Sequence, residues 1–312
     1  MIYPKRMTLS LSNVCTKNCY YCDFPQFQKT ASVASFKNLE KSVKIFNTEW
    51  DMNTGGLQKY SFRVEGGEPG ELPEEVLDFW YSECKVPKYI LLSNGEYFKK
   101  GYHLKYPDKY SIIMHHVLAG SLLDMKKDDF LEIPDYGIKQ YLVVTGNKNF
   151  DLVEAAIKKY PNKEWHISPE TICKSVKRKI DYSLRDKILG LIEKYPQVSD
   201  SHVKEQFIQM ESVTLDQRIM CSNDYSKPYF DARNMKLKRC IASYTNSSEI
   251  ELTQENFHDI LLNKKPLFPL YDEMCLNCEI KEIYRDYFKQ YKIPEIMDII
   301  NKMKALKNDL PK

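Results

Sequence analysis

Residues 12–24, SNVCTKNCYYCDF, place three cysteines in one short loop, and this loop decides how the rest of the chain is interpreted. Cys15, Cys19 and Cys22 have the spacing C-x3-C-x2-C and follow the apolar run 7–11 directly. Three thiolates on one loop can ligate three irons of a four-iron cluster. The fourth iron then lacks a protein ligand, and such an open position allows another molecule to bind. The alternative is a zinc knuckle, although zinc sites usually use paired C-x2-C or Cys/His ligands.

The composition is that of a globular protein without an export signal. The 312 residues, 43% of them hydrophobic, suffice for one large domain or for one domain with an appendage. A formal net charge of +3 gives no indication of nucleic acid or an acidic membrane as partner. No apolar run approaches the roughly 20 residues that span a bilayer. Residues 1–6 are not expected to be a signal peptide, because no apolar stretch follows their positive charges. Nine cysteines in such a chain favour metal binding over disulfides and predict a cytoplasmic protein.

Apolar runs and helical patterns alternate along the first two thirds of the chain. The expected strands cover residues 7–12, 60–65, 89–93, 110–115, 139–145 and 164–168. The expected helices cover residues 35–49, 73–83, 121–127, 152–159 and 174–194, after which the alternation is expected to stop. Six such units predict an α/β fold with a parallel sheet and right-handed crossovers. In parallel barrels the chemistry lies at the C-terminal ends of the strands, where the cysteine loop is expected.

The cysteine loop resembles that of the radical S-adenosylmethionine (SAM) superfamily, and two later strand ends extend the resemblance. Gly66-Gly67-Glu68-Pro69 matches the G-G-E-P motif of the family, and Ser93-Asn94-Gly95 resembles its S/T-N-G motif. The resemblance implies a partial (β/α)6 TIM-like barrel, with a 4Fe–4S cluster on the three cysteines and SAM chelating the open iron. It also implies that an electron from the cluster cleaves SAM to methionine and a 5′-deoxyadenosyl radical, which abstracts a substrate hydrogen.

The resemblance also implies cofactor contacts at the successive strand ends. In the family an aromatic residue before the third cysteine lies beside the adenine, the G-G-E-P segment receives the SAM amino group, and the fifth and sixth strands contact ribose or carboxylate and adenine. The implied SAM-contacting residues are Tyr21, Gly66, Gly67, Glu68, Pro69, Ser93, Asn94, His115, Thr145 and Ile167. For His115 the alternative is a histidine pair with His116 that is exposed or satisfied locally.

Several polar residues near the strand ends are candidates for the substrate pocket. Glu65 stands where the family often has Thr or Ser, and is a candidate substrate ligand or base. Side chains alternate along a strand, so only some of the candidates face inward. The candidates are Arg63, Glu65, His115, His166 and Ser168.

Two cysteines, Cys84 and Cys173, belong neither to the loop of residues 12–24 nor to the set at positions 221, 240, 275 and 278. Cys173, beyond the sixth strand, is a candidate hydrogen donor, because epimerases of this family use a cysteine thiol in this way; the alternative is a packed thiol at a helix start. Cys84 is expected to be a buried, inert thiol.

A second set of cysteines follows the expected barrel, at Cys221, Cys240, Cys275 and Cys278. Between them we expect a β-hairpin turning at residues 231–234 and a helix over residues 254–263. This order resembles the twitch domain, the short form of the SPASM domain, found in 2-deoxy-scyllo-inosamine dehydrogenase and, in related forms, in aminoglycoside epimerases and peptide maturases. The resemblance implies a second, auxiliary 4Fe–4S cluster. A structural zinc site is the alternative.

The expected domains are a radical SAM barrel over residues 1–200, a twitch/SPASM-like auxiliary domain over 205–290 and a C-terminal helix over 291–312. The resemblance implies an enzyme that oxidises or epimerises a small polar molecule or a peptide, reduced by a partner such as flavodoxin or ferredoxin. One alternative is an enzyme that cross-links ribosomal peptides. A second alternative is not an enzyme but a scaffold protein that binds zinc or an iron–sulfur cluster. The first strand begins near residue 7, so no fused leader-peptide-binding domain is expected, and a peptide substrate would require a separate recognition protein.

Overall fold

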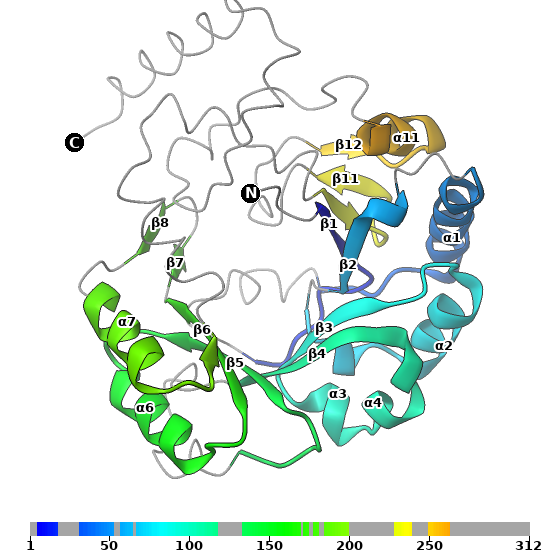
Figure 1. Cartoon of the computed structure of the whole chain (residues 1–312). Coiled ribbons are helices and arrows are strands. Elements are labelled where there is room, and N and C mark those ends of the chain that lie inside the picture. Colours follow the sequence, from blue (N-terminus) through cyan, green and yellow to red (C-terminus); the bar gives the residue numbers. More distant parts are fainter. Residues whose placement is uncertain are drawn as a thin grey trace, which may run out of the picture.

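The structure is a computed structural model, and it describes residues 5–17, 31–52, 57–64, 67–117, 133–169, 171–174, 177–180, 184–199, 228–238 and 249–262. A curved ten-stranded sheet forms its centre (Figure 1), in the order β12-β11-β10-β1-β2-β3-β4-β5-β6-β9. The strands are β1 (Lys5–Ser10), β2 (Tyr60–Val64), β3 (Tyr89–Ser93), β4 (Tyr110–Val117), β5 (Gln140–Thr145), β6 (Glu164–Pro169), β9 (Val198–Ser199), β10 (Tyr229–Asp231), β11 (Lys236–Lys238) and β12 (Glu249–Glu251).

The six predicted strands pair in sequence order, and every pair from β1 to β6 is parallel. The predicted α/β fold with a partial barrel is therefore confirmed. The helices lie outside the curve of the sheet (Figure 1). They are α1 (Phe36–Asp51), α2 (Glu74–Glu83), α3 (Glu96–Lys99), α4 (Tyr102–Lys105), α6 (Phe150–Lys159), α7 (Arg185–Lys194) and α11 (Gln254–Leu262), with the short 3-10 turns η2 (Leu57–Lys59), η3 (Pro69–Glu71) and η4 (Pro107–Lys109).

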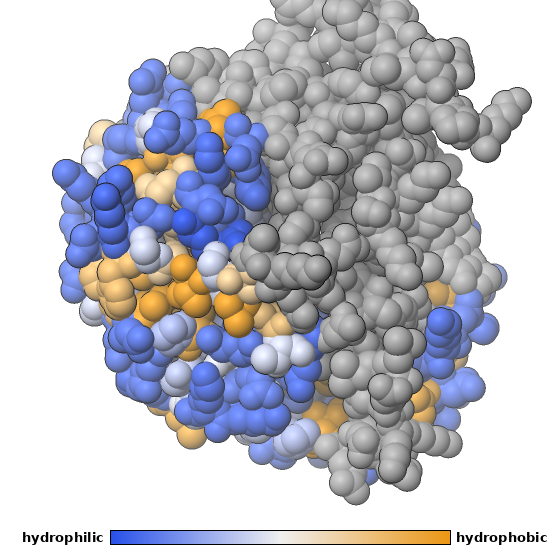
Figure 2. Space-filling model, turned by 180° about the vertical axis from the view of Figure 1, so that it is seen from behind, coloured by the Kyte–Doolittle hydropathy of each residue, from blue (hydrophilic) through white to orange (hydrophobic). Residues whose placement is uncertain are grey.

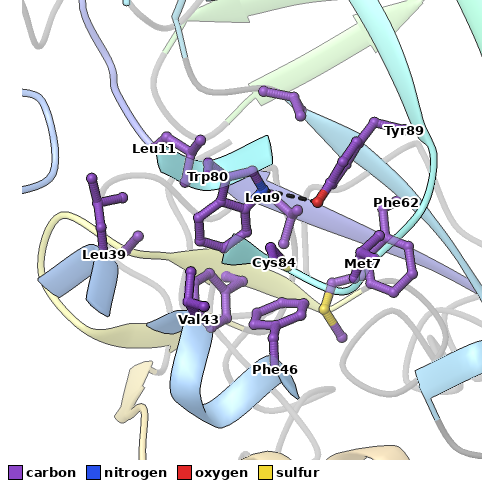
Figure 3. Close-up of a cluster of buried hydrophobic side chains, with 14 of the residues drawn as sticks. Met7, Leu9, Leu11, Leu39, Val43, Phe46, Phe62, Trp80, Cys84 and Tyr89 are labelled. Carbon is purple, nitrogen blue, oxygen red and sulfur yellow. Dashed lines mark hydrogen bonds between the residues drawn. The ribbon is translucent and has the colours of Figure 1, made fainter. Parts of the chain in front are cut away.

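The hydrophobic core fills the space between the sheet and these helices (Figure 3). Met7 and Leu9 of β1 pack in one buried cluster with Phe46 of α1 and Trp80 of α2. The Trp80 indole donates a hydrogen bond of 3.0 Å to the Tyr89 hydroxyl, which satisfies two buried polar groups. Cys84 is buried in this cluster, as predicted. Since alternate strand residues fill the helix-covered side, the residues between them face the concave side of the sheet.

The predicted helix over residues 174–194 is wrong in its first half. Strand β7 (Thr171–Lys174) pairs in antiparallel orientation with β8 (Lys177–Ile180), and α7 begins only at Arg185. The segment TICKSVKRKI contains four β-branched residues and four cations. β-Branched residues favour strands, and cations three or four residues apart repel one another on a helix. Cys173 therefore lies in β7 opposite Arg178, and not at the start of a helix.

The β–α alternation was expected to stop after residue 194, but one more parallel strand, β9, follows α7 before consecutive strands replace the alternation among the described residues. The short strand β9 pairs in parallel with β6, and β10 pairs in parallel with β1. Thus β10 and β11 form the predicted hairpin, but they extend the barrel sheet, with the Ala232 amide donating to the Ser10 carbonyl at 3.0 Å. The predicted helix over residues 254–263 is confirmed as α11, whose Phe257 lies in the same core as Phe46. The predicted helices over 121–127 and 291–312 lie outside the described residues.

The surface opposite to the view of Figure 1 is mainly hydrophilic over its described part, with smaller hydrophobic areas between (Figure 2). None of the helices within the described ranges combines the length and the apolar character needed to cross a bilayer.

Candidate active site

The segments that follow β1 and β2 touch through their backbones. Gly67 has a φ of +149°, and a Cβ atom at this position would lie 2.4 Å from the carbonyl oxygen of Val14. The Glu68 amide donates a hydrogen bond of 2.8 Å to the same oxygen. Only glycine allows this approach. The second glycine of the G-G-E-P motif therefore lets that segment lie against the cysteine loop, one residue before Cys15.

The side chain of Glu68 connects the segment after β2 to the turn after β3. Its Oε1 atom accepts hydrogen bonds from the Ser93 hydroxyl at 2.6 Å and from the Gly70 amide at 2.8 Å. Its Oε2 atom accepts one of 2.7 Å from the Asn94 amide. Burial raises the pKa of this carboxyl group to about 7, and the three donors act in the opposite direction. The Glu68 carboxylate thus holds the segment after β2 against the turn after β3 by hydrogen bonds within the protein.

Cys15 lies half-buried at the C-terminal side of β1, and its neighbours are also fixed by hydrogen bonds. The Asn94 side-chain amide donates to the Cys15 sulfur at an Nδ2–Sγ distance of 3.7 Å. The Thr16 amide and hydroxyl both donate to Glu71 Oε1, at 2.8 and 2.7 Å. Glu71 and Thr16 were missed in the sequence, where their only signal is their position beside the two motifs.

The donor set around Cys15 fits an iron–sulfur ligand, because cluster thiolates commonly accept hydrogen bonds from nearby groups. Tyr21, Cys19 and Cys22 lie outside the described residues, as do Glu65 and Gly66 and the cysteines at 221, 240, 275 and 278. Within the described ranges, no group of three or more His, Cys, Asp or Glu residues is placed to hold a metal ion.

The structure places three of the implied SAM contacts on the helix-covered side of the sheet. His115 pairs with Ser93 and Tyr141, and its ring lies 5.6 Å from that of Phe98. Burial lowers the pKa of His115 to about 4, so it is neutral near pH 7. Thr145 is fully buried, and the side chain of Ile167 belongs to the core under α6 and α7. Any contact of Ile167 with adenine would have to use its backbone, as the resemblance implies.

The concave side carries a different set of polar residues. Register places His116 of β4 beside Leu142 of β5, and Leu142 beside His166 of β6, with alternation turning these residues away from the helices. Burial lowers the pKa of His116 to about 4, and the nearby charges of His115 and Arg63 act in the same direction. Burial also lowers the pKa of His166, whose Nε2 atom is buried with no hydrogen-bond partner among the described residues.

Three candidates for the substrate pocket face the concave side of the sheet, namely Arg63, His166 and Ser168. The fourth described candidate, His115, faces the helices. His116 replaces His115 on the inner face. The sequence carried both histidines but no signal for the phase of β4, which has three half-buried and two exposed residues before His115.

Comparisons with known proteins support the fold. No family model matches the sequence, and no curated protein matches it significantly. The structure is similar to that of anSMEcpe with bound AdoMet and the Cp18Cys peptide, with a TM-score of 0.52 and 12% identity over 96% of this chain and 99% of that chain. A further match is BtrN in complex with AdoMet and 2-DOIA, with a TM-score of 0.39 and 11% identity over 91% of this chain and 98% of that one. The likeness to anSMEcpe concerns the fold, and it agrees with the partial barrel that was expected from the sequence.

Proposed function

We propose that this chain is a radical SAM enzyme that binds a 4Fe–4S cluster through Cys15, Cys19 and Cys22. The observation that carries the proposal is the convergence of three motif segments: Gly67 lies against Val14, and Asn94 donates to the Cys15 sulfur. When bound, the cluster and SAM supply the reductive cleavage that yields a 5′-deoxyadenosyl radical, which is chemistry that side chains lack. The AdoMet bound in the anSMEcpe structure supports SAM as the cosubstrate.

The residues of the chain hold and orient the reactants in this proposal. Cys15 serves as a thiolate ligand, while Glu71 accepts a hydrogen bond from the Thr16 amide on one side of it and the Glu68 amide donates one to Val14 on the other. The substrate occupies the concave side of the sheet. Arg63 and His116 offer polar groups there near the C-terminal ends of their strands, and His166 offers one from the middle of β6. The neutral imidazoles of His116 and His166 can each donate or accept a hydrogen bond to a polar substrate.

At a finer level we infer that the substrate radical is oxidised or epimerised with the help of an auxiliary 4Fe–4S cluster on Cys221, Cys240, Cys275 and Cys278. The motif order supports this inference, and the peptide bound to anSMEcpe supports a peptide as one of the two substrate classes. The other class is a small polar molecule. Cross-linking of a ribosomal peptide remains the alternative outcome. It removes two hydrogens, as oxidation does, so it is distinguished by fragmentation of the product, in which two residues stay joined.

The test is anaerobic reconstitution followed by measurement of iron, sulfide and zinc per chain, on wild type and on a Cys15/Cys19/Cys22→Ala triple variant. We expect two clusters in wild type, one in the variant, and SAM cleavage by dithionite-reduced wild type alone. Zinc in place of iron, with no SAM cleavage, would leave a metal-binding scaffold and overturn the proposal. One cluster in wild type that the variant loses, with zinc at the second set, would remove the auxiliary cluster from the mechanism.

Cys173 provides a separate test of epimerisation. Register places Cys173 in β7, the strand that follows β6. If its thiol returns a hydrogen to the substrate radical, Cys173→Ala should retain SAM cleavage and stop epimerisation. Unchanged epimerisation would remove Cys173 from the mechanism.

A further inference from the structure

We propose that Asn94 is a positioning residue that sets the reduction potential of the cluster held by Cys15, through an N–H···S hydrogen bond to the Cys15 sulfur. This inference rests on the proposed function. Its basis is the Nδ2–Sγ distance of 3.7 Å, which joins the turn after β3 to the loop after β1 across 79 residues of sequence. The contact is directed at a ligand atom of the cluster, so it acts whether or not SAM is bound.

The orientation of the Asn94 amide is determined by its second contact. Its Oδ1 atom accepts a hydrogen bond of 3.3 Å from the Glu96 amide. A flipped side chain would place its NH2 group against that N–H donor and its oxygen against the sulfur, which loses both hydrogen bonds. The NH2 group is therefore the end that faces Cys15.

The backbone around Asn94 is held by several hydrogen bonds besides the one from the Glu96 amide to its side chain. The Asn94 amide donates to Glu68 Oε2 at 2.7 Å, and the Ser93 hydroxyl accepts from the Gly95 and Tyr97 amides at 3.1 and 3.2 Å. Gly95 adopts a φ of +112° that completes the turn. A substitution at position 94 is therefore expected to change the contact with sulfur while the turn stays in place.

The direction of the effect follows from charge. One-electron reduction by an external donor adds negative charge to the cluster and its thiolate sulfurs. A hydrogen bond to one of these sulfurs is stronger in the reduced state, which raises the reduction potential. Removing the donor should lower the ratio of reduced to oxidised cluster at a fixed solution potential by about three- to tenfold, and tenfold corresponds to about 59 mV for a one-electron couple.

The experiment is a dithionite titration monitored by electron paramagnetic resonance on reconstituted protein without SAM, following the cluster whose signal changes when SAM is later added. Asn94→Leu removes the donor at nearly the same volume. Asn94→Asp keeps the acceptor for the Glu96 amide and adds a negative charge. We expect both variants to have a lower potential than wild type, with Asp lower than Leu. Asn47→Leu is the matched control, since it makes the same substitution in α1, at a side chain that bonds to the backbone of Glu83 and Lys85, and its potential should equal that of wild type.

Iron content separates the possible failures. If wild type forms no cluster on the cysteine loop, the proposed function itself fails. If Asn94→Leu or Asn94→Asp retains wild-type iron and wild-type potential, the tuning role is overturned. A variant that weakens only the affinity for SAM, with the potential unchanged, would make Asn94 a SAM contact and likewise overturn it. Should Asn94→Leu fail to retain iron, the comparison rests on Asn94→Asp, in which the hydrogen bond from Glu96 is preserved.

Discussion

Glu71 holds Thr16 with a single carboxylate oxygen, which accepts from the Thr16 amide at 2.8 Å and from its hydroxyl at 2.7 Å. Glu71 is the last residue of η3 and lies two residues after the G-G-E-P motif, and Thr16 directly follows Cys15. We expect Glu71→Ala to accelerate the loss of iron from reconstituted protein to a chelator by about fivefold, a modest effect because the pair is exposed to solvent. Thr16→Val keeps the amide contact and should have a smaller effect. Glu75→Ala, at an exposed position in α2, is the control, and equal rates for Glu71→Ala and Glu75→Ala would contradict the role of Glu71.

Alanine substitutions at three glycines distinguish two costs at Gly67: the collision of a Cβ atom with Val14 and the strain of a positive φ. Gly67→Ala introduces a Cβ atom 2.4 Å from the Val14 oxygen at a φ of +149°, and should destabilise the fold by at least about 3 kcal/mol and prevent cluster binding. Gly101→Ala meets no atom within 4 Å but has a φ of +72°, so about 1 kcal/mol is expected. Gly190→Ala, within α7 and also in open space, should stabilise by about 0.5–1 kcal/mol. Urea denaturation measures all three, and a Gly67→Ala protein as stable as Gly101→Ala would show that the contact with Val14 yields easily.

Glu68 makes stability depend on pH in an unusual direction for a carboxyl group. Its pKa is raised from 4.5 to about 7 in the folded chain, chiefly by burial. Between these values the folded chain binds more protons than the unfolded chain, so the free energy of unfolding falls as pH rises, by about 3 kcal/mol over the whole window. The stabilisation is complete below pH 4.5 and lost above 7.

The measurement is urea denaturation of the apoprotein at several pH values from 5 to 8, for wild type and Glu68→Gln. Glutamine does not ionise, so its variant should lack this part of the pH dependence even if its stability is lower throughout. The difference between the two curves isolates Glu68 from the other titrating groups. Parallel curves would mean that the three hydrogen-bond donors hold the carboxylate ionised, with its pKa near the ordinary value.

The barrel could be predicted from the sequence because local residue patterns indicate the order of its strands and helices along the chain. The runs at 60–64 and 89–93 alternate buried and half-buried residues and end in glycine-containing turns, and each became a strand. Ser35 caps α1 by accepting from the Asn38 amide, as the capping preference of serine suggests. Two glycines after a strand allow a close backbone approach, and Gly67 makes one with Val14.

Other features depend on contacts that the local sequence does not record. The two residues of β9 and the three of β10 are too short for a periodic signal, and they are strands because β6 and β1 offer parallel edges. The inward phase of β4 depends on Val117 entering the core beside Val143. The contact between Asn94 and Cys15 joins two loops whose approach follows only from the order of the strands.

The attachment of α11 to α1 centres on the buried carboxylate of Glu49. His258 Nδ1 lies 3.0 Å from Glu49 Oε2, and the Gln254 side chain also contacts Glu49. Phe257, Ile260 and Leu261 of α11 bury their side chains in the barrel core next to these polar contacts. Glu49→Ala leaves the polar groups of Gln254 and His258 without their acceptor and opens a cavity, so we expect a loss of about 2–3 kcal/mol.

The expected signature is local as well as global. Amide hydrogen exchange in residues 254–262 should accelerate in Glu49→Ala more than exchange in β3 or β5, because α11 loses its anchor while the central strands keep theirs. Glu40→Ala is the matched control, since Glu40 is an exposed glutamate on the same helix α1. Equal protection of α11 in the two variants would mean that Phe257 and its apolar neighbours hold the helix by themselves, and that the contact between Glu49 and His258 adds nothing to its attachment.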